Sequence, residues 1–238
     1  MALSLIIMAY REAENLTTLI PKAIENIEKV EKDYEILVVD SPNSNDNTKE
    51  ICEQFGVKHI LQEIPGYAGA FQTGVKYASK DIFLMMDADF SHPPEVIPTL
   101  YKTFTEGNFD VGIGSRYVKD GVNDDEKQNI IFSKILNFAY RTMFGLEKIG
   151  DISAGFKMYR TEQIKPLPPL MSKFFEMHIE VLVKLKLNKQ DLKVVEVPIH
   201  FKEREKGESK RNYFTFLPQF GILLIRLFFY KLFYRKKV

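Results

Sequence analysis

Apolar runs alternate with stretches of helical spacing along the first half of the chain. The runs are continuous enough for buried strands, and the stretches between them repeat apolar residues every three or four positions. We expect strands over 3–10, 34–40, 57–63 and 81–87 and helices over 15–30, 47–55 and 68–79, the first helix being capped by Asn15. This alternation predicts an α/β fold, with a Rossmann-like, mostly parallel sheet and helices on both of its faces.

The second half continues the alternation less regularly. We expect a helix over 95–107 and a strand over 109–117, followed by a polar stretch, 118–129, that is typical of a mobile loop. Beyond it, the pattern predicts a helix over 131–146, a helix over 174–187, and strands over 151–159 and 193–201.

Helix 131–146 is more apolar than a surface helix needs to be. Lys134, Asn137 and Arg141 form one polar stripe, and aliphatic or aromatic residues occupy nearly every other position. We therefore expect this helix to lie in a membrane interface.

The C-terminal segment 213–238 is also strongly apolar. Its length approaches the roughly 20 residues of a bilayer-spanning helix, but Pro218 and Arg226 argue against a clean span. We expect an amphipathic helix lying in the membrane interface, its aromatic side chains embedded and its cations at headgroup level. A core-packing helix with a basic end is the alternative.

Composition and charge change this picture only slightly. The 238 residues are 45% hydrophobic and 27% charged, which indicates an ordinary globular protein. We expect a globular core over 1–210 and an apolar, basic tail over 211–238. The formal net charge is +1, yet residues 202–238 contain ten Lys and Arg against three Glu. We expect an anionic membrane surface, and not nucleic acid, as the partner of this tail.

Cysteine usage and the first residues indicate the compartment. Cys52 is the single cysteine of the sequence, so an internal disulfide is excluded and the thiol is expected to be buried and inert. The N-terminal apolar run lacks a basic leader and is interpreted as the first strand. Together these features predict a protein on the cytoplasmic side of a membrane, peripheral or monotopic.

Polar residues follow three of the predicted strands. They are Tyr10-Arg11-Glu12, Asp40-Ser41-Pro42-Asn43 and Asp87-Ala88-Asp89. Because ligands of open parallel sheets bind beyond the carboxyl ends of the strands, we expect these residues to share one site.

Asp87 and Asp89 stand one residue apart at the end of an apolar strand. Carboxylate oxygens suit Mg²⁺ or Mn²⁺, and either ion can hold a diphosphate. A turn in which an aspartate caps the helix that begins around Pro93-Pro94-Glu95 is the structural alternative.

Five ordered stretches give the chain its resemblance to a known family. They are AYREAENL (9–16), VVDSPNSNDNT (38–48), GYAGAFQTGVKYA (66–78), MDADFSHPPE with IGSRY (86–95, 113–117), and DISAGFKMY with EVPIHFKEREKGESK (151–159, 196–210). The chain resembles the family 2 glycosyltransferases of the GT-A fold, and within them the dolichol-phosphate mannose synthases and related polyprenol-phosphate glycosyltransferases.

The resemblance implies roles for individual residues. Asp87 would lie near the sugar diphosphate, Asp89 would ligate the metal ion, and Ser91 would add to the metal's coordination in place of a glutamine. Residues implied at the nucleoside are Tyr10, Glu12 and Asp40. Arg116 matches an arginine associated with the acceptor phosphate, which suits its guanidinium fork. Residues implied to close over the donor diphosphate and acceptor are Arg204, Ser209 and Lys210.

The implied reaction is hexose transfer with inversion from a nucleotide diphosphate sugar, GDP-mannose before UDP-glucose, to a polyprenol phosphate. A phosphate that is already largely dianionic needs no general base. Catalysis would rest on positioning and charge, supplied by the metal, Arg116, Arg204 and Lys210. A saccharide hydroxyl acceptor would instead need a base, for which Asp151 is the candidate.

Two other functions remain open at this point. One is a catalytically silent homologue that binds nucleotide, and the other is a nucleotidyltransferase, although no Gly-rich, Lys-containing loop follows the first strand. The histidines lack HxH or HExxH spacing. We expect His92 in a turn, and His59, His178 and His200 to be packed or at the surface.

Overall fold

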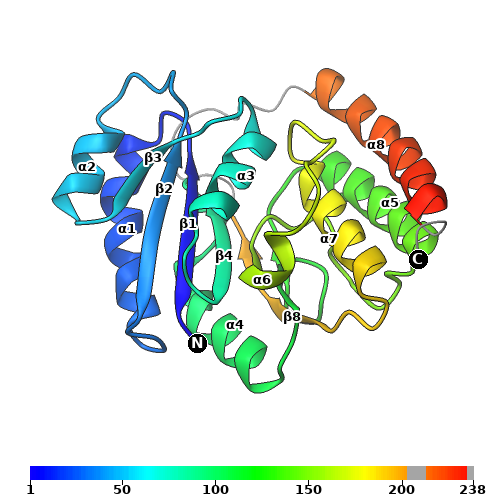
Figure 1. Ribbon diagram of the computed structural model, residues 1–238, viewed down its shortest axis with the longest axis horizontal. Coiled ribbons are helices and arrows are strands. Elements are labelled where there is room, and N and C mark those ends of the chain that lie inside the picture. Colours follow the sequence, from blue (N-terminus) through cyan, green and yellow to red (C-terminus); the bar gives the residue numbers. More distant parts are fainter. Residues whose placement is uncertain (203–212, 235–238) are drawn as a thin grey trace.

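The computed structural model describes residues 1–202 and 213–234, and it places a seven-stranded sheet at the centre of the molecule (Figure 1). The strand order is β3-β2-β1-β4-β7-β5-β8, and a two-stranded sheet pairs β6 with β9. The strands are β1 (Leu3–Ala9), β2 (Tyr34–Asp40), β3 (Lys58–Leu61), β4 (Ile82–Asp87), β5 (Val111–Ser115), β6 (Val122–Asn123), β7 (Lys157–Arg160), β8 (Val194–Pro198) and β9 (His200–Phe201).

Every strand of the large sheet is parallel to its neighbours except β7. This strand runs antiparallel to both β4 and β5, between which it is inserted. Strands β1, β2 and β4 are almost fully buried, as the continuous apolar runs predicted. The mostly parallel sheet expected from the sequence is confirmed.

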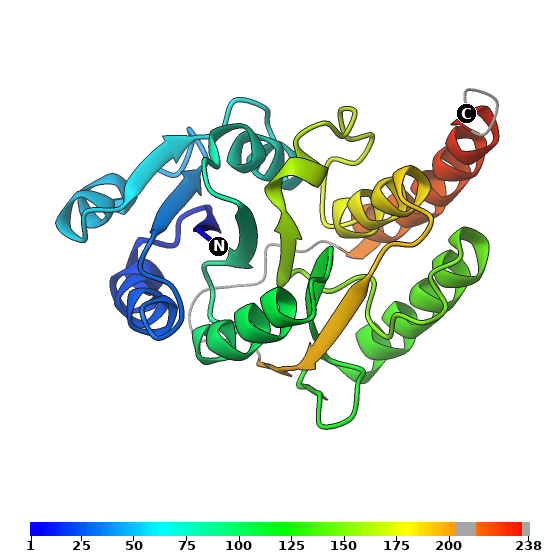
Figure 2. The same cartoon turned by 60° about the horizontal axis from the view of Figure 1, so that its bottom comes forward.

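Helices cover both faces of the sheet (Figure 2). They are α1 (Ala13–Ile27), α2 (Thr48–Gln54), α3 (Tyr67–Tyr77), η1 (Pro94–Val96), α4 (Ile97–Glu106), α5 (Lys127–Phe144), α6 (Thr161–Ile164), α7 (Met177–Asn188) and α8 (Tyr213–Tyr234). Alternate residues of β1 face opposite cores: Leu5 and Ile7 lie with α1 and α4, and Ile6 and Met8 lie with α3 and α7.

Several local expectations are wrong in detail. Asn15 does not cap the first helix, because α1 begins after Glu12 and Asn15 is buried inside it, donating to Glu12 Oε2 at 2.6 Å. The backbone N–H of Ala13 instead donates to Asp46 Oδ2 at 3.1 Å, a contact supplied by the next loop.

The polar stretch 118–129 is not a continuous loop. Val122 and Asn123 form β6, which pairs with β9 nearly eighty residues away in the sequence, and α5 begins at Lys127. The predicted strand 151–159 is reduced to β7, Lys157–Arg160, because residues 151–155 form turns instead of extended backbone.

Helix α8 packs one side on α5 and α7, at the edge of the molecule seen in Figure 1. Phe220, Leu223 and Leu227 are buried, and Tyr140 of α5 donates its hydroxyl to the carbonyl of Phe220. No helix in the described residues is long and apolar enough to traverse a bilayer.

Candidate active site

The strand exits converge at one edge of the sheet, as expected. Strand β1 lies between β2 and β4, and its register pairs Ala9 with Asp40 on one side and Met8 with Asp87 on the other. The residues that follow β1 therefore emerge between two aspartates that are far apart in the sequence. Parallel pairing of buried strands is what brings them together.

Asp87 and Asp89 occupy a tight turn at the end of β4, and both are partly exposed. The backbone N–H of Asp87 donates to His92 Nδ1 at 3.0 Å. Asp89 Oδ1 accepts from the backbone N–H of Ser91 at 3.1 Å and from its hydroxyl at 2.6 Å. Phe90 between them has φ 63°, a left-handed conformation that bulky residues rarely adopt.

The turn is thus real, but it does not cap the helix that follows. Element η1 has no side-chain cap, and Pro93 precedes it. Asp89 interacts with Ser91 within the turn instead, so the three residues predicted at the metal lie within one short segment.

The chemistry of this segment fits a divalent cation. Asp87, Asp89 and Ser91 offer oxygen ligands, which hard cations prefer, and Mg²⁺ is commonly bound through one or two carboxylates together with substrate phosphates. Among residues 1–202 and 213–234, no group of three His, Cys, Asp or Glu is arranged to hold a metal.

The residues expected at the nucleoside are less uniformly placed. Tyr10 is 40% exposed at the edge of the sheet. Glu12 is nearly buried and accepts from Asn15 of α1. Asp40 is 4% exposed; one of its oxygens accepts from the Ser44 hydroxyl, and the other lies 3.2 Å from His59 Nε2. In the described residues, Asp40 therefore acts as the centre of a buried polar cluster.

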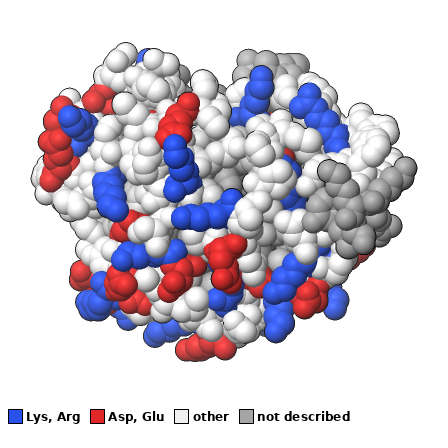
Figure 3. Space-filling view, in the orientation of Figure 1, with Lys and Arg blue, Asp and Glu red and all other residues white. Residues whose placement is uncertain are grey.

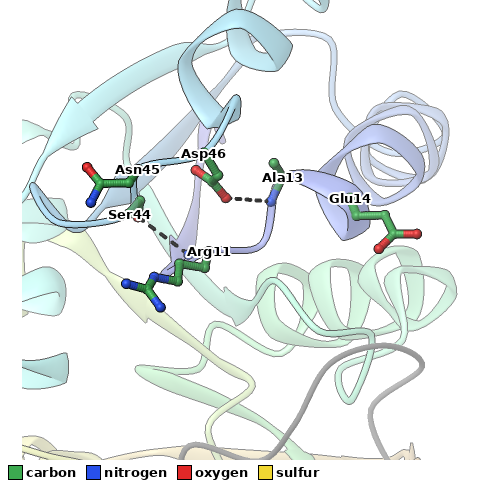
Figure 4. A pocket seen from close by; sticks show the side chains of 6 residues that line it. All are labelled: Arg11, Ala13, Glu14, Ser44, Asn45 and Asp46. Atoms are coloured by element: carbon green, nitrogen blue, oxygen red, sulfur yellow. Dashed lines mark hydrogen bonds between the residues drawn. The ribbon is translucent and has the colours of Figure 1, made fainter.

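A pocket opens beside this cluster, between the loops that follow β1 and β2 (Figure 4). Arg11 and Asn45 line it in left-handed conformations, with φ 57° and 49°. The Arg11 guanidinium also lies 5.2 Å from the centre of the Tyr10 ring. The remaining lining residues are Ala13, Glu14, Ser44 and Asp46.

Arg116 follows β5 and forms a two-pronged ion pair with Asp151. Its Nε donates to Oδ2 at 2.7 Å and its Nη2 to Oδ1 at 2.8 Å. Nη2 also donates to Ser153 Oγ at 2.9 Å, and the rings of Tyr117 and Phe201 lie 5.1 and 5.3 Å from the guanidinium carbon. The Asp151 side chain is fully buried and that of Arg116 is 10% exposed.

Arg116 and Asp151 each shift the pKa of the other toward the charged form. Burial opposes the charge on Asp151, but the charge and hydrogen bonds of Arg116 outweigh it and lower the pKa of the carboxyl. Burial likewise opposes the charge on Arg116, and Asp151 still raises the pKa of the guanidinium. A carboxylate with a lowered pKa and both oxygens engaged by an arginine is a poor general base.

Lys157 of β7 lies behind the same pair. Burial lowers the pKa of its ammonium to about 7, against the opposing attraction of Asp151. Its Nζ donates to the carbonyls of Ile152 at 2.7 Å and His178 at 3.2 Å. The lysine thereby fixes the loop that carries Asp151 to the start of α7.

The remaining predicted site residues, Arg204, Ser209 and Lys210, lie outside the described residues.

His92 lies in a turn, as expected, but sequence reasoning missed its contact with Asp87. It is 2% exposed, accepts the Asp87 N–H and stacks on Phe156 at 5.5 Å between ring centres. Its position five residues after Asp87, at the start of His-Pro-Pro, was the available signal. Ser153 was also missed, because its contact with Arg116 joins segments 37 residues apart.

Comparison with known proteins places the chain in a family. The family described as Glycosyl transferase family 2 matches residues 4–167. The chain belongs to this family. A dolichol-phosphate mannosyltransferase of Pyrococcus furiosus is 38% identical over 223 residues, which are 88% of this chain and 59% of that protein.

A second relative is less similar in sequence. An undecaprenyl-phosphate 4-deoxy-4-formamido-L-arabinose transferase of Proteus mirabilis is 26% identical over 216 residues, covering 88% of this chain and 63% of that protein. The chain thus spans between 59% and 63% of the length of these two relatives.

Solved structures show the same fold. Glucosyl-3-phosphoglycerate synthase from Mycobacterium tuberculosis, in complex with Mn²⁺, uridine diphosphate and phosphoglyceric acid, superimposes with a TM-score of 0.73 at 16% identity. The match covers 97% of this chain and 78% of that one. The same enzyme in complex with Mg²⁺ and uridine diphosphate gives a TM-score of 0.70. The GT-A fold expected from the sequence is confirmed.

Proposed function

We propose that this chain transfers a hexose with inversion from a nucleotide diphosphate sugar to a polyprenol phosphate, with GDP-mannose as the first donor to test and UDP-glucose as the second. Family membership and the 38% identity to a dolichol-phosphate mannosyltransferase support this class of reaction. The relative from Proteus mirabilis is named for an undecaprenyl-phosphate acceptor, which supports a lipid phosphate.

The outward faces of α5 and α8 are the observation that carries the proposal. On α5, Ile131, Ile135 and Phe138 are 60%, 61% and 71% exposed. Exposed apolar residues continue along α8, namely Ile222, Ile225, Phe228, Phe229, Leu232 and Phe233. A water-soluble acceptor gives no reason for such faces, whereas a lipid whose tail stays in the bilayer does.

The distribution of charge supports a membrane surface at the same place. In Figure 3, the visible acidic side chains lie mainly over the left and lower parts of the molecule, and the upper right, over α8, is largely uncharged with a few cations. Arg226 of α8 and Lys134 of α5 are exposed. Cations beside an apolar face favour a helix at the headgroup level of an anionic leaflet. We propose peripheral or monotopic attachment to the cytoplasmic face.

Helix α5 also connects this surface to the arginine proposed for the acceptor phosphate. Asn137, on the inward side of α5, accepts from the Ile152 N–H at 2.7 Å and donates to Ser153 Oγ at 2.9 Å. Ser153 accepts in turn from Arg116. A lipid entering beside α5 would therefore bring its phosphate to the Arg116 side of the sheet edge.

The chemistry requires positioning more than proton transfer. The lipid phosphate, with a second pKa of about 6, is largely dianionic at neutral pH. One of its oxygens attacks the anomeric carbon as the bond to the donor's diphosphate breaks, and the electron pair leaves with the nucleoside diphosphate. Single displacement inverts the anomeric centre. A saccharide hydroxyl acceptor would need a general base. Asp151 is a poor one because Arg116 engages both of its oxygens, and this argues against such an acceptor.

In this proposal Asp87, Asp89 and Ser91 would hold Mg²⁺ or Mn²⁺. Bound there, the ion supplies charge that stabilises the departing diphosphate. Tyr10 and the polar cluster around Asp40 would face the nucleoside, and Arg116 would orient the acceptor phosphate.

A donor screen tests the proposal. The chain is incubated with radiolabelled GDP-mannose or UDP-glucose, a short-chain polyprenol phosphate and Mn²⁺, and label is counted in the organic extract. Label from GDP-mannose is expected. Label from UDP-glucose alone would keep the reaction class and correct the sugar. Nucleotide binding by calorimetry without transfer from either donor would indicate a silent homologue.

Asp89→Ala separates the metal role from the rest of the site. We expect turnover to fall on the order of 100-fold or more, because the charge on the leaving group loses its main stabilisation. Near-normal turnover would remove Asp89 from the metal site.

A further inference from the structure

Tyr67 is the first residue of α3, and its side chain reaches the end of β4. The hydroxyl donates to Asp87 Oδ1 at 2.6 Å, a short contact of the kind that charge-assisted hydrogen bonds give. It joins residues 20 apart in the sequence. Sequence reasoning assigned Tyr67 no functional role.

His178, near the start of α7, lies on the other side of the same hydroxyl. Its Nε2 is 3.2 Å from the Tyr67 oxygen. The Tyr67 hydroxyl donates its one proton to Asp87, so its oxygen can only accept from His178. In this arrangement His178 Nε2 is the N–H donor to Tyr67. The result is a directed chain of hydrogen bonds from His178 through Tyr67 to Asp87.

Packing holds the tyrosine in place independently of these hydrogen bonds. The Phe175 ring lies 4.2 Å from the Tyr67 ring between centroids, and the His178 ring contacts it edge-on at 5.4 Å. The backbone is fixed too, since Ala68 N–H donates to the Lys173 carbonyl at 3.1 Å. A Cβ on Gly66 would lie 2.8 Å from that same carbonyl, so the approach of the two segments requires glycine.

A second glycine lets both histidines approach Asp87. A Cβ at Gly155 would lie 2.8 Å from His92 Cε1 and 3.3 Å from His178 Nε2. His92 accepts the Asp87 backbone N–H, and His178 acts on its carboxylate through Tyr67. The backbone and the side chain of Asp87 are thus each fixed by a buried imidazole.

We propose that Tyr67 and His178 are positioning residues for Asp87. The hydroxyl of Tyr67 fixes the rotation of the carboxylate, and His178 fixes the direction of that hydroxyl. This inference rests on the proposed function, in which Asp87 faces the metal and the donor diphosphate. Groups that orient a metal's carboxylates by hydrogen bonds typically change metal affinity 10- to 100-fold when they are removed.

The test uses the full chain and four variants: Tyr67→Phe, His178→Phe, the double variant and Tyr34→Phe. Tyr34 is the matched control, because its hydroxyl also donates to a carboxylate, Glu28 Oε1 at 3.0 Å, but at the opposite end of the sheet. Bound Mn²⁺ is measured by electron paramagnetic resonance in the presence of GDP, and separately of UDP. The kcat and KM for the donor are measured alongside.

Tyr67→Phe is expected to weaken Mn²⁺ binding about tenfold, at the lower end of that range, while Tyr34→Phe leaves it unchanged. Because His178 acts through the Tyr67 hydroxyl, the double variant is expected to bind Mn²⁺ no more weakly than Tyr67→Phe alone. Unchanged Mn²⁺ affinity in Tyr67→Phe overturns the role of Tyr67. Additive losses in the double variant overturn the relay from His178.

Asp89→Ala distinguishes failure of this inference from failure of the proposed site. If Asp89→Ala loses Mn²⁺ and Tyr67→Phe retains it, only the positioning role is wrong. If Asp89→Ala binds Mn²⁺ like the unmodified chain, the proposed metal site is wrong and the inference falls with it. Should His178→Phe not fold, Tyr67→Phe, which keeps the ring and its packing, still decides the outcome.

Discussion

The pair of Arg116 and Asp151 couples stability to the side of the site where we propose that the acceptor phosphate binds. Both oxygens of Asp151 accept from Arg116, and Glu196 accepts the backbone N–H groups of Gly150 and Asp151 at 2.6 and 2.9 Å. The arginine is thereby held rigidly where an anion would meet it. Such preorganisation comes at the cost of burying two charges.

We expect Asp151→Asn to destabilise the fold by about 3 kcal/mol, because it leaves a buried guanidinium without its counter-charge. Urea unfolding measures this change. Asp124→Asn is the control, since Asp124 pairs with His200 at 2.7 Å but is 44% exposed, and its loss should cost under about 1 kcal/mol. Equal small losses for both variants would contradict the view that Asp151 is a buried structural anion.

For individual residues, the sequence predicts a functional role where a local pattern marks the residue. Asp87 and Asp89 are recognisable because two carboxylates follow an apolar strand directly. The contacts of Tyr67 with Asp87 and His178 span 20 and 111 residues. Nothing local marks them, since they depend on which helices the fold brings to the end of β4.

Among the elements, the long buried strands were predicted best. Strand β2 has the predicted bounds, and β1 and β4 differ from their predicted bounds by one residue. Strands that are buried on both faces are continuous apolar runs, and such short runs are readily recognised as strands. Short elements were not predicted well. Strands β6 and β7 depend on partners elsewhere in the chain. Asp151 and Ile152 bond instead with Arg116 and with Asn137 of α5.

Helix α5 shows a second kind of error. The sequence grouped Asn137 with Lys134 and Arg141 in one polar stripe, yet Asn137 is 2% exposed and serves the loop beneath it. Ile131, Ile135 and Phe138 are exposed, whereas Tyr140 and Phe144 are buried. An inward-facing asparagine that bonds to backbone groups cannot be recognised from periodicity, because periodicity records which residues are polar and not what they bind.

We expect Phe138→Glu to reduce binding of the chain to vesicles that contain anionic lipid about tenfold or more, because transfer of one phenyl side chain out of water contributes about 1.5–3 kcal/mol. Co-sedimentation measures the change. Stability should be unaffected, as Phe138 is 71% exposed. Leu61→Glu, at an exposed position on the far edge strand β3, is the control. Equal binding by both variants would exclude α5 from the membrane contact.

In the whole molecule, two apolar cores share one sheet, and the ionisable groups buried between them make stability depend on pH. Lys157 is the main example. Burial lowers its pKa to about 7 from an ordinary 10.5, with Asp151 and Glu196 opposing that shift and Arg116 adding to it. Between these values the unfolded chain binds a proton that the folded chain does not. The contribution of Lys157 to stability therefore rises with pH from about 7 to about 10.5 and is flat below 7.

Comparison with Lys157→Met isolates this effect. Urea unfolding between pH 6 and pH 10 should show the unmodified chain gaining stability relative to the variant as the pH rises above about 7. Parallel curves across this range would show that the lysine is charged in the folded protein at all of these pH values.

The antiparallel insertion of β7 has a consequence for the order in which the chain can assemble. Strands β3, β2, β1 and β4 pair using residues 3–87 alone. Strand β5 comes next in the sequence but bonds only to β7 and β8 within the sheet. During synthesis, the backbone groups on the edge of β4 that faces β7 stay unpaired until Lys157–Arg160 has left the ribosome. Over that interval a nascent chain carries an exposed strand edge, which is a template for association with another copy.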